Sequence, residues 1–196
     1  MTEKEIHKTC EKYGITNYLI NDDLSIDVNN SVNLSDINIK KLPLNFNRIQ
    51  DMFLVSNSNL ESLIGSPYYT KSFTCSNNKL TTLNGGPKEV ENTYYCNNNK
   101  LESLQGSPNK LRNLYCINNR LKNFEYAPNY IENSFSCNVN YIKSFKNLPK
   151  YIGNNFNCTD NHLTSFKYCP EIGGKFNCSH NQIRTFHFFT MFEGNI

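Results

Sequence analysis

Apolar and polar positions recur along the chain with a fixed period. A small apolar residue or a cysteine returns every 20 or 21 residues, and an aromatic residue or leucine stands two positions before all but the first of them. The returning residues are Leu34, Val55, Cys75, Cys96, Cys116, Cys137, Cys158 and Cys178. Because one period aligns several columns at once, the chain is built from structural repeats.

Each repeat has the pattern of a short strand followed by a turn. The aromatic residue and the cysteine alternate at a spacing of two, which places both on one inward face of a strand. Apolar residues follow five and eight positions after the cysteine, and a proline closes six of the repeats. Repeats of this length leave no room for a full helix. We therefore expect a curved, right-handed parallel β solenoid of about eight coils, with little or no helix on its convex side.

An asparagine column follows the strands. It stands three positions after the cysteine, where the chain leaves the strand, and its amide can satisfy backbone groups of its own turn and of the neighbouring coil. The sequence therefore predicts a structural ladder in which Asn119 is costly to replace and its neighbour Asn118 is not. The predicted ladder consists of Asn78, Asn99, Asn119, Asn140, Asn161 and Asn181.

The repeat resembles a leucine-rich repeat. In the stretch IENSFSCNVNYIKSF (131–145), apolar residues and Asn140 occupy the successive consensus positions, with Cys137 in place of a leucine. The short coil with its proline is similar to the bacterial type, which has roughly 20–22 residues per repeat. The stretch 18–43 is similar to the start of leucine-rich-repeat proteins found in phage genomes. The resemblance implies the solenoid fold and leaves the function open.

The two ends depart from the repeat, since a solenoid must cover its terminal coils. Residues 2–14 predict a short helix with Thr2 as N-cap and Glu5 as its capping-box partner. Residues 24–36 predict a hairpin that turns at Asn29 and Asn30. We thus expect one domain with an N-terminal cap (1–33), a repeat solenoid (34–186) and a folded-back C-terminal cap (187–196).

Composition limits the classes of function. Charged residues make up 19% of the chain and the net charge is only +3, so no strong field for a membrane or nucleic acid follows from the bulk balance. The start of the chain lacks an apolar signal segment, and no apolar run is long enough to span a bilayer. Eight cysteines without a secretory signal favour reduced thiols and a cytoplasmic location, the host cytoplasm if a phage encodes the chain.

Two cysteine–histidine spacings resemble metal-ligand spacings, Cys158 with His162 and Cys178 with His180. The strand alternation points the cysteines inward, whereas the histidines fall in columns otherwise filled by solvent-exposed residue types. We therefore interpret the cysteines as small apolar fillers and expect neither a metal nor another cofactor. The chain also lacks the sequence motifs of nucleophilic, phosphate-binding and dinucleotide-binding enzymes, so we expect no catalysis.

Binding would then use the outward columns. On the expected concave face most residues are small and polar, and the exceptions form a candidate partner-binding set: Leu54, Tyr95, Tyr115, Ile117 and Val139. The alternative is that strand propensity alone favours these residue types. A basic rim beside the asparagine ladder consists of Lys79, Lys100, Arg120, Lys122 and Lys143. Without aromatic residues among these cations, an acidic protein patch suits the rim as well as nucleic acid does.

The sequence therefore favours a non-catalytic protein-binding module. By analogy with the phage resemblance, the partner would be a host protein, and inhibition of a host defence protein is one outcome. A structural alternative is self-association, as a dimer or larger assembly, through the Phe-rich C-terminal end. Nucleic-acid binding along the basic rim is a second alternative.

Overall fold

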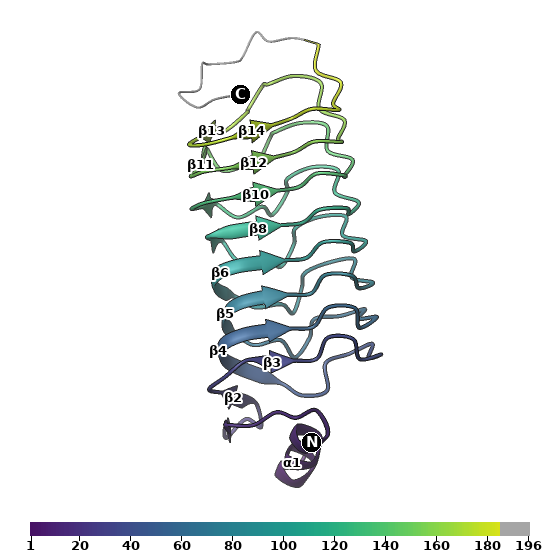
Figure 1. Ribbon diagram of the computed structural model, residues 1–196, viewed down its shortest axis with the longest axis vertical. Helices are drawn as coiled ribbons and strands as arrows, with labels where there is room; N and C mark the ends of the chain where they lie inside the picture. Colours follow the sequence, from purple (N-terminus) through teal and green to yellow (C-terminus); the bar gives the residue numbers. More distant parts are fainter. Residues whose placement is uncertain (185–196) are drawn as a thin grey trace.

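The computed structural model describes residues 1–184 and shows a parallel β solenoid of about eight turns. The coils stack into one elongated column, with the N-terminal helix at its base (Figure 1). This is the fold that the repeat period predicts. Among the described residues, no helix has the length and apolar character needed to cross a bilayer.

The N-terminal helix α1 (Glu3–Lys12) has the predicted cap. The Thr2 hydroxyl accepts a hydrogen bond from the Glu5 N–H (3.4 Å), and the Glu5 carboxylate accepts one from the Thr2 N–H (2.7 Å). These bonds satisfy donors that a helix start leaves free. They also lower the pKa of Glu5. Ile6 and Cys10 are buried, so the helix covers the base of the core.

The predicted hairpin at 24–36 is wrong in position. The antiparallel pair is β1 (Tyr18–Ile20) with β2 (Ile26–Val28), so the chain turns between them. After Asn29 and Asn30, β3 (Val32–Asn33) pairs in parallel with β4, as β2 also does. Parallel stacking thus begins before Leu34, where the solenoid was expected to start.

One long sheet runs along the column and is parallel throughout, except for the antiparallel β1–β2 pair at its base. Its strands follow chain order, and each aromatic position pairs with the same position one coil later, as Phe53 does with Phe73. Beyond the first three strands, its members are β4 (Phe46–Leu54), β5 (Tyr69–Thr74), β6 (Glu89–Tyr95), β8 (Asn113–Tyr115), β10 (Phe135–Ser136), β12 (Phe156–Asn157) and β14 (Phe176–Asn177).

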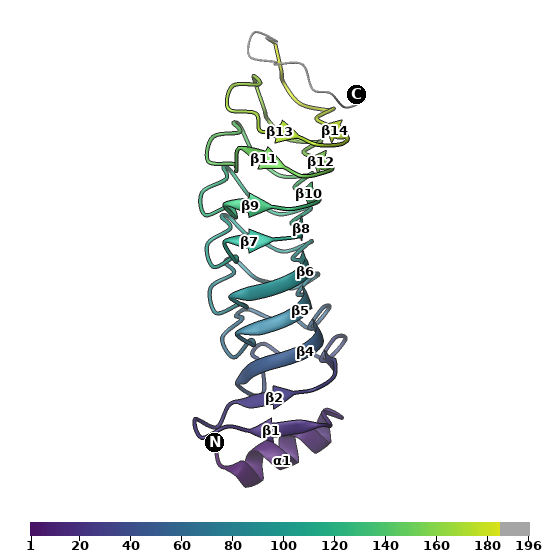
Figure 2. The ribbon, with the colours of Figure 1, turned by 90° about the vertical axis from the view of Figure 1, so that its left-hand side faces the viewer.

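A second parallel sheet of four strands lies beside the first in the upper coils (Figure 2). In the lower coils, β4, β5 and β6 are long strands that cover the same part of the coil, with a register shift in the middle. The second sheet consists of β7 (Lys110–Leu111), β9 (Tyr130–Ile131), β11 (Tyr151–Ile152) and β13 (Glu171–Ile172). Each coil thus has two walls that meet at a bend, and both walls face one core.

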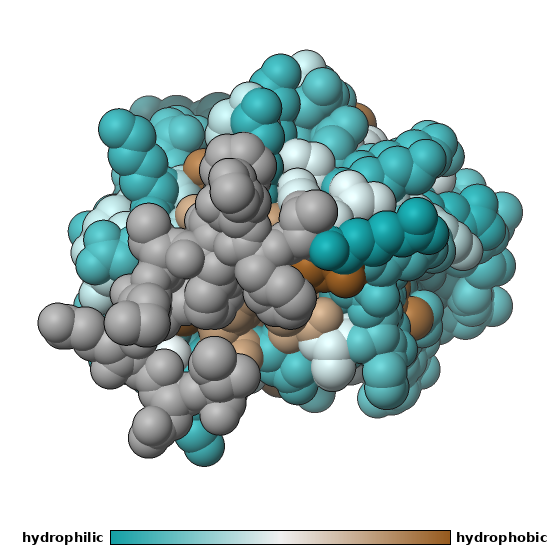
Figure 3. Space-filling model, turned by 90° about the horizontal axis from the view of Figure 1, so that it is seen from above, coloured by the Kyte–Doolittle hydropathy of each residue, from teal (hydrophilic) through white to brown (hydrophobic). Residues whose placement is uncertain are grey.

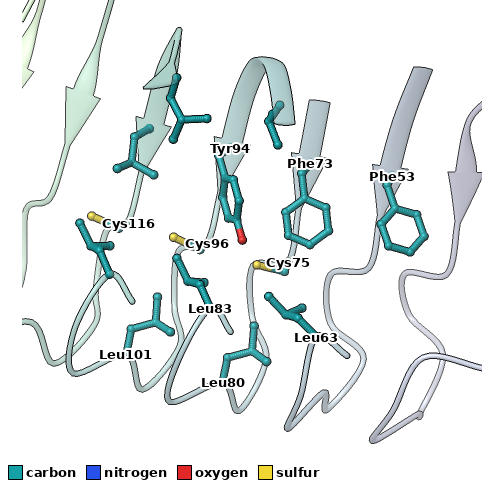
Figure 4. Packing of buried hydrophobic residues seen from close by; sticks show 14 of the residues in the cluster. Phe53, Leu63, Phe73, Cys75, Leu80, Leu83, Tyr94, Cys96, Leu101 and Cys116 are labelled. Atoms are coloured by element: carbon teal, nitrogen blue, oxygen red, sulfur yellow. The ribbon is translucent and has the colours of Figure 1, made fainter. Parts of the chain in front are cut away.

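The core is a set of vertical columns of like side chains. Figure 4 shows the aromatic column Phe53, Phe73 and Tyr94 beside the cysteine column, with leucines on the opposite side. From Phe53 to Phe156 the aromatic column is at most 1% exposed. Within the column, Phe135 and Phe156 stack with their ring centroids 5.4 Å apart. The coils from Phe53 to Phe156 bury the same positions, which is the predicted alternation, whereas Phe176 and Cys178 of the last described coil are only partly buried.

The predicted asparagine ladder is present. In Asn119, Oδ1 accepts a hydrogen bond from the Leu101 N–H (3.1 Å), and Nδ2 donates to the carbonyl oxygens of Cys96 (3.0 Å) and Cys116 (3.1 Å). The amide therefore ties its own turn to the coil below. Equivalent bonds to the backbone of two coils are made by Asn78, Asn99, Asn140, Asn161 and Asn181.

Candidate binding surface

A pair of stacked tyrosines stands on the outer face of the long sheet. Tyr95 and Tyr115 are direct neighbours in the parallel register, and their ring centroids lie 4.8 Å apart with an interplanar angle of 15°. Tyr95 is 39% exposed and Tyr115 is half-buried. Thr74 lies below the pair in the same column and Ser136 lies above it. The pair therefore stands between two polar neighbours, Thr74 and Ser136, in its column.

Ile117 is the last residue in a series of hydrogen bonds that join successive coils. In this series a side chain of one coil accepts a hydrogen bond from the backbone N–H of the next: Ser76 Oγ from Asn97 (3.2 Å), and Asn97 Oδ1 from Ile117 (2.8 Å). The side chain of Ile117 has no acceptor to offer the coil above. In this column an apolar side chain, that of Ile117, thus stands where Ser76 and Asn97 have hydrogen-bonding side chains, and it lies near the tyrosine pair.

Val139 interrupts a second column in the next coil. In this column the backbone is left-handed, with φ of 54° at Asn98, 53° at Asn118 and 58° at Val139. Asn118 Nδ2 donates to Asn98 Oδ1 (2.8 Å), as Asn98 does to Asn77 (2.7 Å). Asparagine tolerates this conformation, whereas a β-branched residue is a genuine outlier there. Val139 is 43% exposed and, unlike Asn98 and Asn118, has no side chain that can form a hydrogen bond, so neither a side-chain hydrogen bond nor burial compensates the strained backbone.

The structure brings together four of the five residues predicted for the partner-binding set. The four residues occupy three consecutive coils: Tyr95 lies in the first, Tyr115 and Ile117 in the second, and Val139 in the third. Ile117 and Val139 follow the ends of their strands, two and three positions after the tyrosine column. Leu54 does not join them, because Thr74 stands between it and Tyr95. We call these four residues the apolar step. Burial raises the pKa of the Tyr115 hydroxyl, with a smaller effect from Tyr95, so the hydroxyl stays protonated at neutral pH and can donate a hydrogen bond.

The basic rim lies on the turns that follow the strands, on the right of Figure 1. All five predicted cations are exposed. Lys122 lies 3.8 Å from the Glu102 carboxylate, and Glu61 is paired with Lys40 at 3.2 Å. Within residues 1–184, the remaining four members of the rim form no ion pair within 4 Å. They are Lys79, Lys100, Arg120 and Lys143.

The cysteine column is buried as predicted. Five of its members, from Cys75 to Cys158, are fully buried, and all eight cysteines of the chain are free thiols. Burial raises the pKa of each of these five thiols. His180 is exposed and contacts the Asp160 carboxylate (2.9 Å) rather than a cysteine. In the described part of the chain, no three His, Cys, Asp or Glu side chains gather as a metal site would require.

Sequence reasoning missed two exposed features. One is a hollow of about 850 Å³ on the second wall, which is lined by both lysines and glutamates. There the Tyr69 hydroxyl donates to the Glu91 carboxylate (2.8 Å), and Arg48 lies over the Tyr69 ring at 3.9 Å. The other feature is a ring pair on the turns, Tyr141 with His162, whose centroids are 5.9 Å apart. The repeat period itself signals this pair, because both residues occupy the column of Lys79, Lys100 and Arg120.

No known protein-family model matches the chain, and no curated protein sequence is significantly similar to it.

Proposed function

We propose that the chain is a non-catalytic protein-binding module and that the apolar step is the centre of its interface. The observation that carries this proposal is the replacement of polar ladder members at adjacent places. Ile117 ends one hydrogen-bond column and Val139 strains another, and both flank the stacked tyrosines. Strand propensity alone does not account for a valine in a left-handed turn. Tyrosine with aliphatic neighbours on a rigid face is the composition of an interface anchor.

The class of partner follows by analogy. The resemblance of residues 18–43 to phage leucine-rich-repeat proteins makes a host protein the expected partner, and inhibition of a host defence protein one outcome. The rim beside the step adds positive charge, which favours encounter with an acidic protein surface.

A double substitution tests the interface. Tyr95→Ala/Tyr115→Ala should fold normally, because the side chains lie on an outer face, and should weaken partner binding about thirtyfold or more. The measurement is quantitative pull-down from bacterial host lysate, followed by titration of the captured protein. The matched control is Tyr130→Ala/Tyr151→Ala, a similarly exposed tyrosine pair on adjacent strands of the second wall. Undiminished capture by the first variant would refute the proposal.

Self-association is the second candidate. Seen from the C-terminal end of the column, hydrophobic surface is visible near the centre with a hydrophilic surround (Figure 3). Phe176, Cys178 and Ile183 of the last described coil are only partly buried. The predicted cap at 187–196 lies outside the described residues. Light scattering over a range of protein concentrations tests this candidate, since a mass that stays monomeric contradicts it.

A further inference from the structure

One column of the basic rim continues into the exposed ring pair. Lys79, Lys100 and Arg120 occupy equivalent positions in three successive coils, and Tyr141 and His162 occupy the same position in the next two. The backbone shows that they are equivalent: the Lys100 N–H donates to the Leu80 carbonyl (2.8 Å), and the Tyr141 N–H donates to the Leu121 carbonyl (2.9 Å). Side chains of this column therefore leave the turns in the same way, one strand spacing apart.

The cations of this column are available to a ligand. Lys79, Lys100 and Arg120 are exposed and, within residues 1–184, have no carboxylate within 4 Å. Lys143 stands in the adjacent column and is also exposed and without an ion pair in the described chain. Glu61 and Glu102, which share a repeat column with Lys122 and Lys143, each lie within 4 Å of a lysine. The rim therefore keeps a local excess of positive charge although the net charge is only +3.

The rings add a different kind of contact. Tyr141 is 51% exposed, and its ring is tilted by 30° against His162. The Gln182 side chain lies 3.4 Å from the His162 Nδ1 and borders the ring pair on the far side. A base can stack on an exposed ring, whereas an acidic peptide gains nothing comparable from it. Five coils at about 4.8 Å give a track of roughly 19 Å from the first cation to the last ring.

We propose that this column binds single-stranded nucleic acid, with phosphates along Lys79, Lys100 and Arg120 and a base against Tyr141. The site is distinct from the apolar step and does not depend on the protein partner proposed above. Backbone contacts by cations and stacking on aromatic rings are together the recognition mode of single strands without sequence preference. The ligand would be held at the turns, and the sheet face would remain free.

Fluorescence anisotropy tests the proposal with defined probes. Labelled 12-mers of uridine and of deoxythymidine are titrated with the full chain at several salt concentrations, with a labelled 12-residue glutamate peptide in parallel. Four free cations predict a slope of log K against log salt of about −3 at most, and Lys100→Glu/Arg120→Glu should reduce its size by about 1.4. Lys88→Glu/Lys110→Glu changes the net charge equally on the second wall and should have little effect. Tyr141→Ala should weaken oligonucleotide binding about fivefold or more.

Each outcome of this experiment either supports the proposal or contradicts it. Oligonucleotide binding that depends on both the rim charges and Tyr141 supports the proposal, and the two probes separate RNA from DNA. Equal binding of the glutamate peptide, with no effect of Tyr141→Ala, would show a general anion surface and overturn it. The absence of binding at low salt, or equal weakening by the two charge reversals, would overturn it as well. Tyr95→Ala/Tyr115→Ala should leave oligonucleotide binding intact, which separates this test from that of the protein interface.

Discussion

Asn118 and Asn119 are neighbours in the chain with different structural roles. Asn119 is buried and bonds to the backbone of two coils, whereas Asn118 is exposed and holds a left-handed turn. The expectation that Asn118 is freely replaceable overlooked the backbone. The column filled by Asn57, Asn77, Asn98 and Asn118 follows from this conformation, which asparagine tolerates better than most residues.

Substitution separates the two roles. Asn119→Ala should lower the free energy of unfolding by about 1–3 kcal/mol, because it leaves buried backbone groups unsatisfied. Asn118→Ala should cost about 1–2 kcal/mol through the left-handed backbone, whereas Asn118→Gly should cost less because glycine adopts it freely. Urea unfolding of the three variants measures this. If Asn118→Gly and Asn118→Ala were equally destabilised, the hydrogen bond to Asn98 rather than the backbone would be responsible.

Val139 is expected to lower the free energy of unfolding and to strengthen binding of the protein partner. Val139→Asn restores the residue type of the coil below and should raise the free energy of unfolding by about 1 kcal/mol, since strain at such a position costs about 1–3 kcal/mol. The same variant should bind the protein partner more weakly. Val139→Thr, which keeps the β-branch, is the control and should not be stabilised. Thermal unfolding and partner titration on the same samples give both readings, and a destabilised Val139→Asn would contradict the argument.

Tyr94 carries a buried hydroxyl in a column of phenyl rings. The residue is fully buried, and its oxygen has no hydrogen-bond partner among the described residues. Tyr94→Phe should therefore raise the free energy of unfolding by about 1 kcal/mol or more, because an unsatisfied buried hydroxyl is removed. The converse change, Phe73→Tyr in the coil below, should destabilise. Urea midpoints of the two variants test the pair, and a destabilised Tyr94→Phe would reveal a partner for the hydroxyl.

At the scale of elements, the cysteine column makes stability depend on pH. Burial raises the pKa of its thiols above the unfolded value of about 8.5, so the folded chain keeps its protons longer. The titration of these thiols therefore does not affect the free energy of unfolding below about pH 8.5, and this free energy falls as the pH rises above that value. For each buried thiol, the free energy of unfolding should fall by about 1.4 kcal/mol per pH unit between the unfolded and the folded pKa. Urea unfolding at pH 7.5 and 9.5 should show the loss.

A single replacement isolates the effect from other titrations. Val55 occupies the cysteine column in an earlier coil and is fully buried, so Cys116→Val should be accommodated. Between pH 7.5 and 9.5 the free energy of unfolding should fall less for the variant than for the native chain, and the difference should equal the effect of one thiol. An unchanged difference would mean that these thiols do not titrate on unfolding.

The repeating strands and the N-terminal helix were predictable, whereas the hairpin near the N-terminus was misplaced. Fixed columns locate the strands of the long sheet from β4 onward, and the capping box locates the helix. The hairpin failed because Asn29-Asn30 has the composition of a tight turn. The true turn is closed by Asp23, whose carboxylate accepts hydrogen bonds from the N–H (3.0 Å) and hydroxyl (2.6 Å) of Ser25. These bonds lower the pKa of Asp23.

At the scale of the whole molecule, the period identifies columns but not what each column does. It placed Tyr95 and Tyr115 side by side on an outer face, as the structure has them. It could not show that Ile117 and Val139 interrupt hydrogen-bond ladders, because those bonds depend on the backbone angles of each turn. The repeat period also did not predict the second wall, where short strands such as β9 and β11 each contain a tyrosine.

Stacking each coil only on its neighbours has a mechanical consequence. When the two ends of the column are pulled apart, coils should peel away singly, because the ladders join one coil to the next. Each released coil of 20 or 21 residues lengthens the tether by about 70 Å, while the column shortens by only about 4.8 Å. An optical trap should then record a staircase of nearly equal extensions. The force at each step would report how firmly the neighbouring coils are joined, the strained coil of Val139 included.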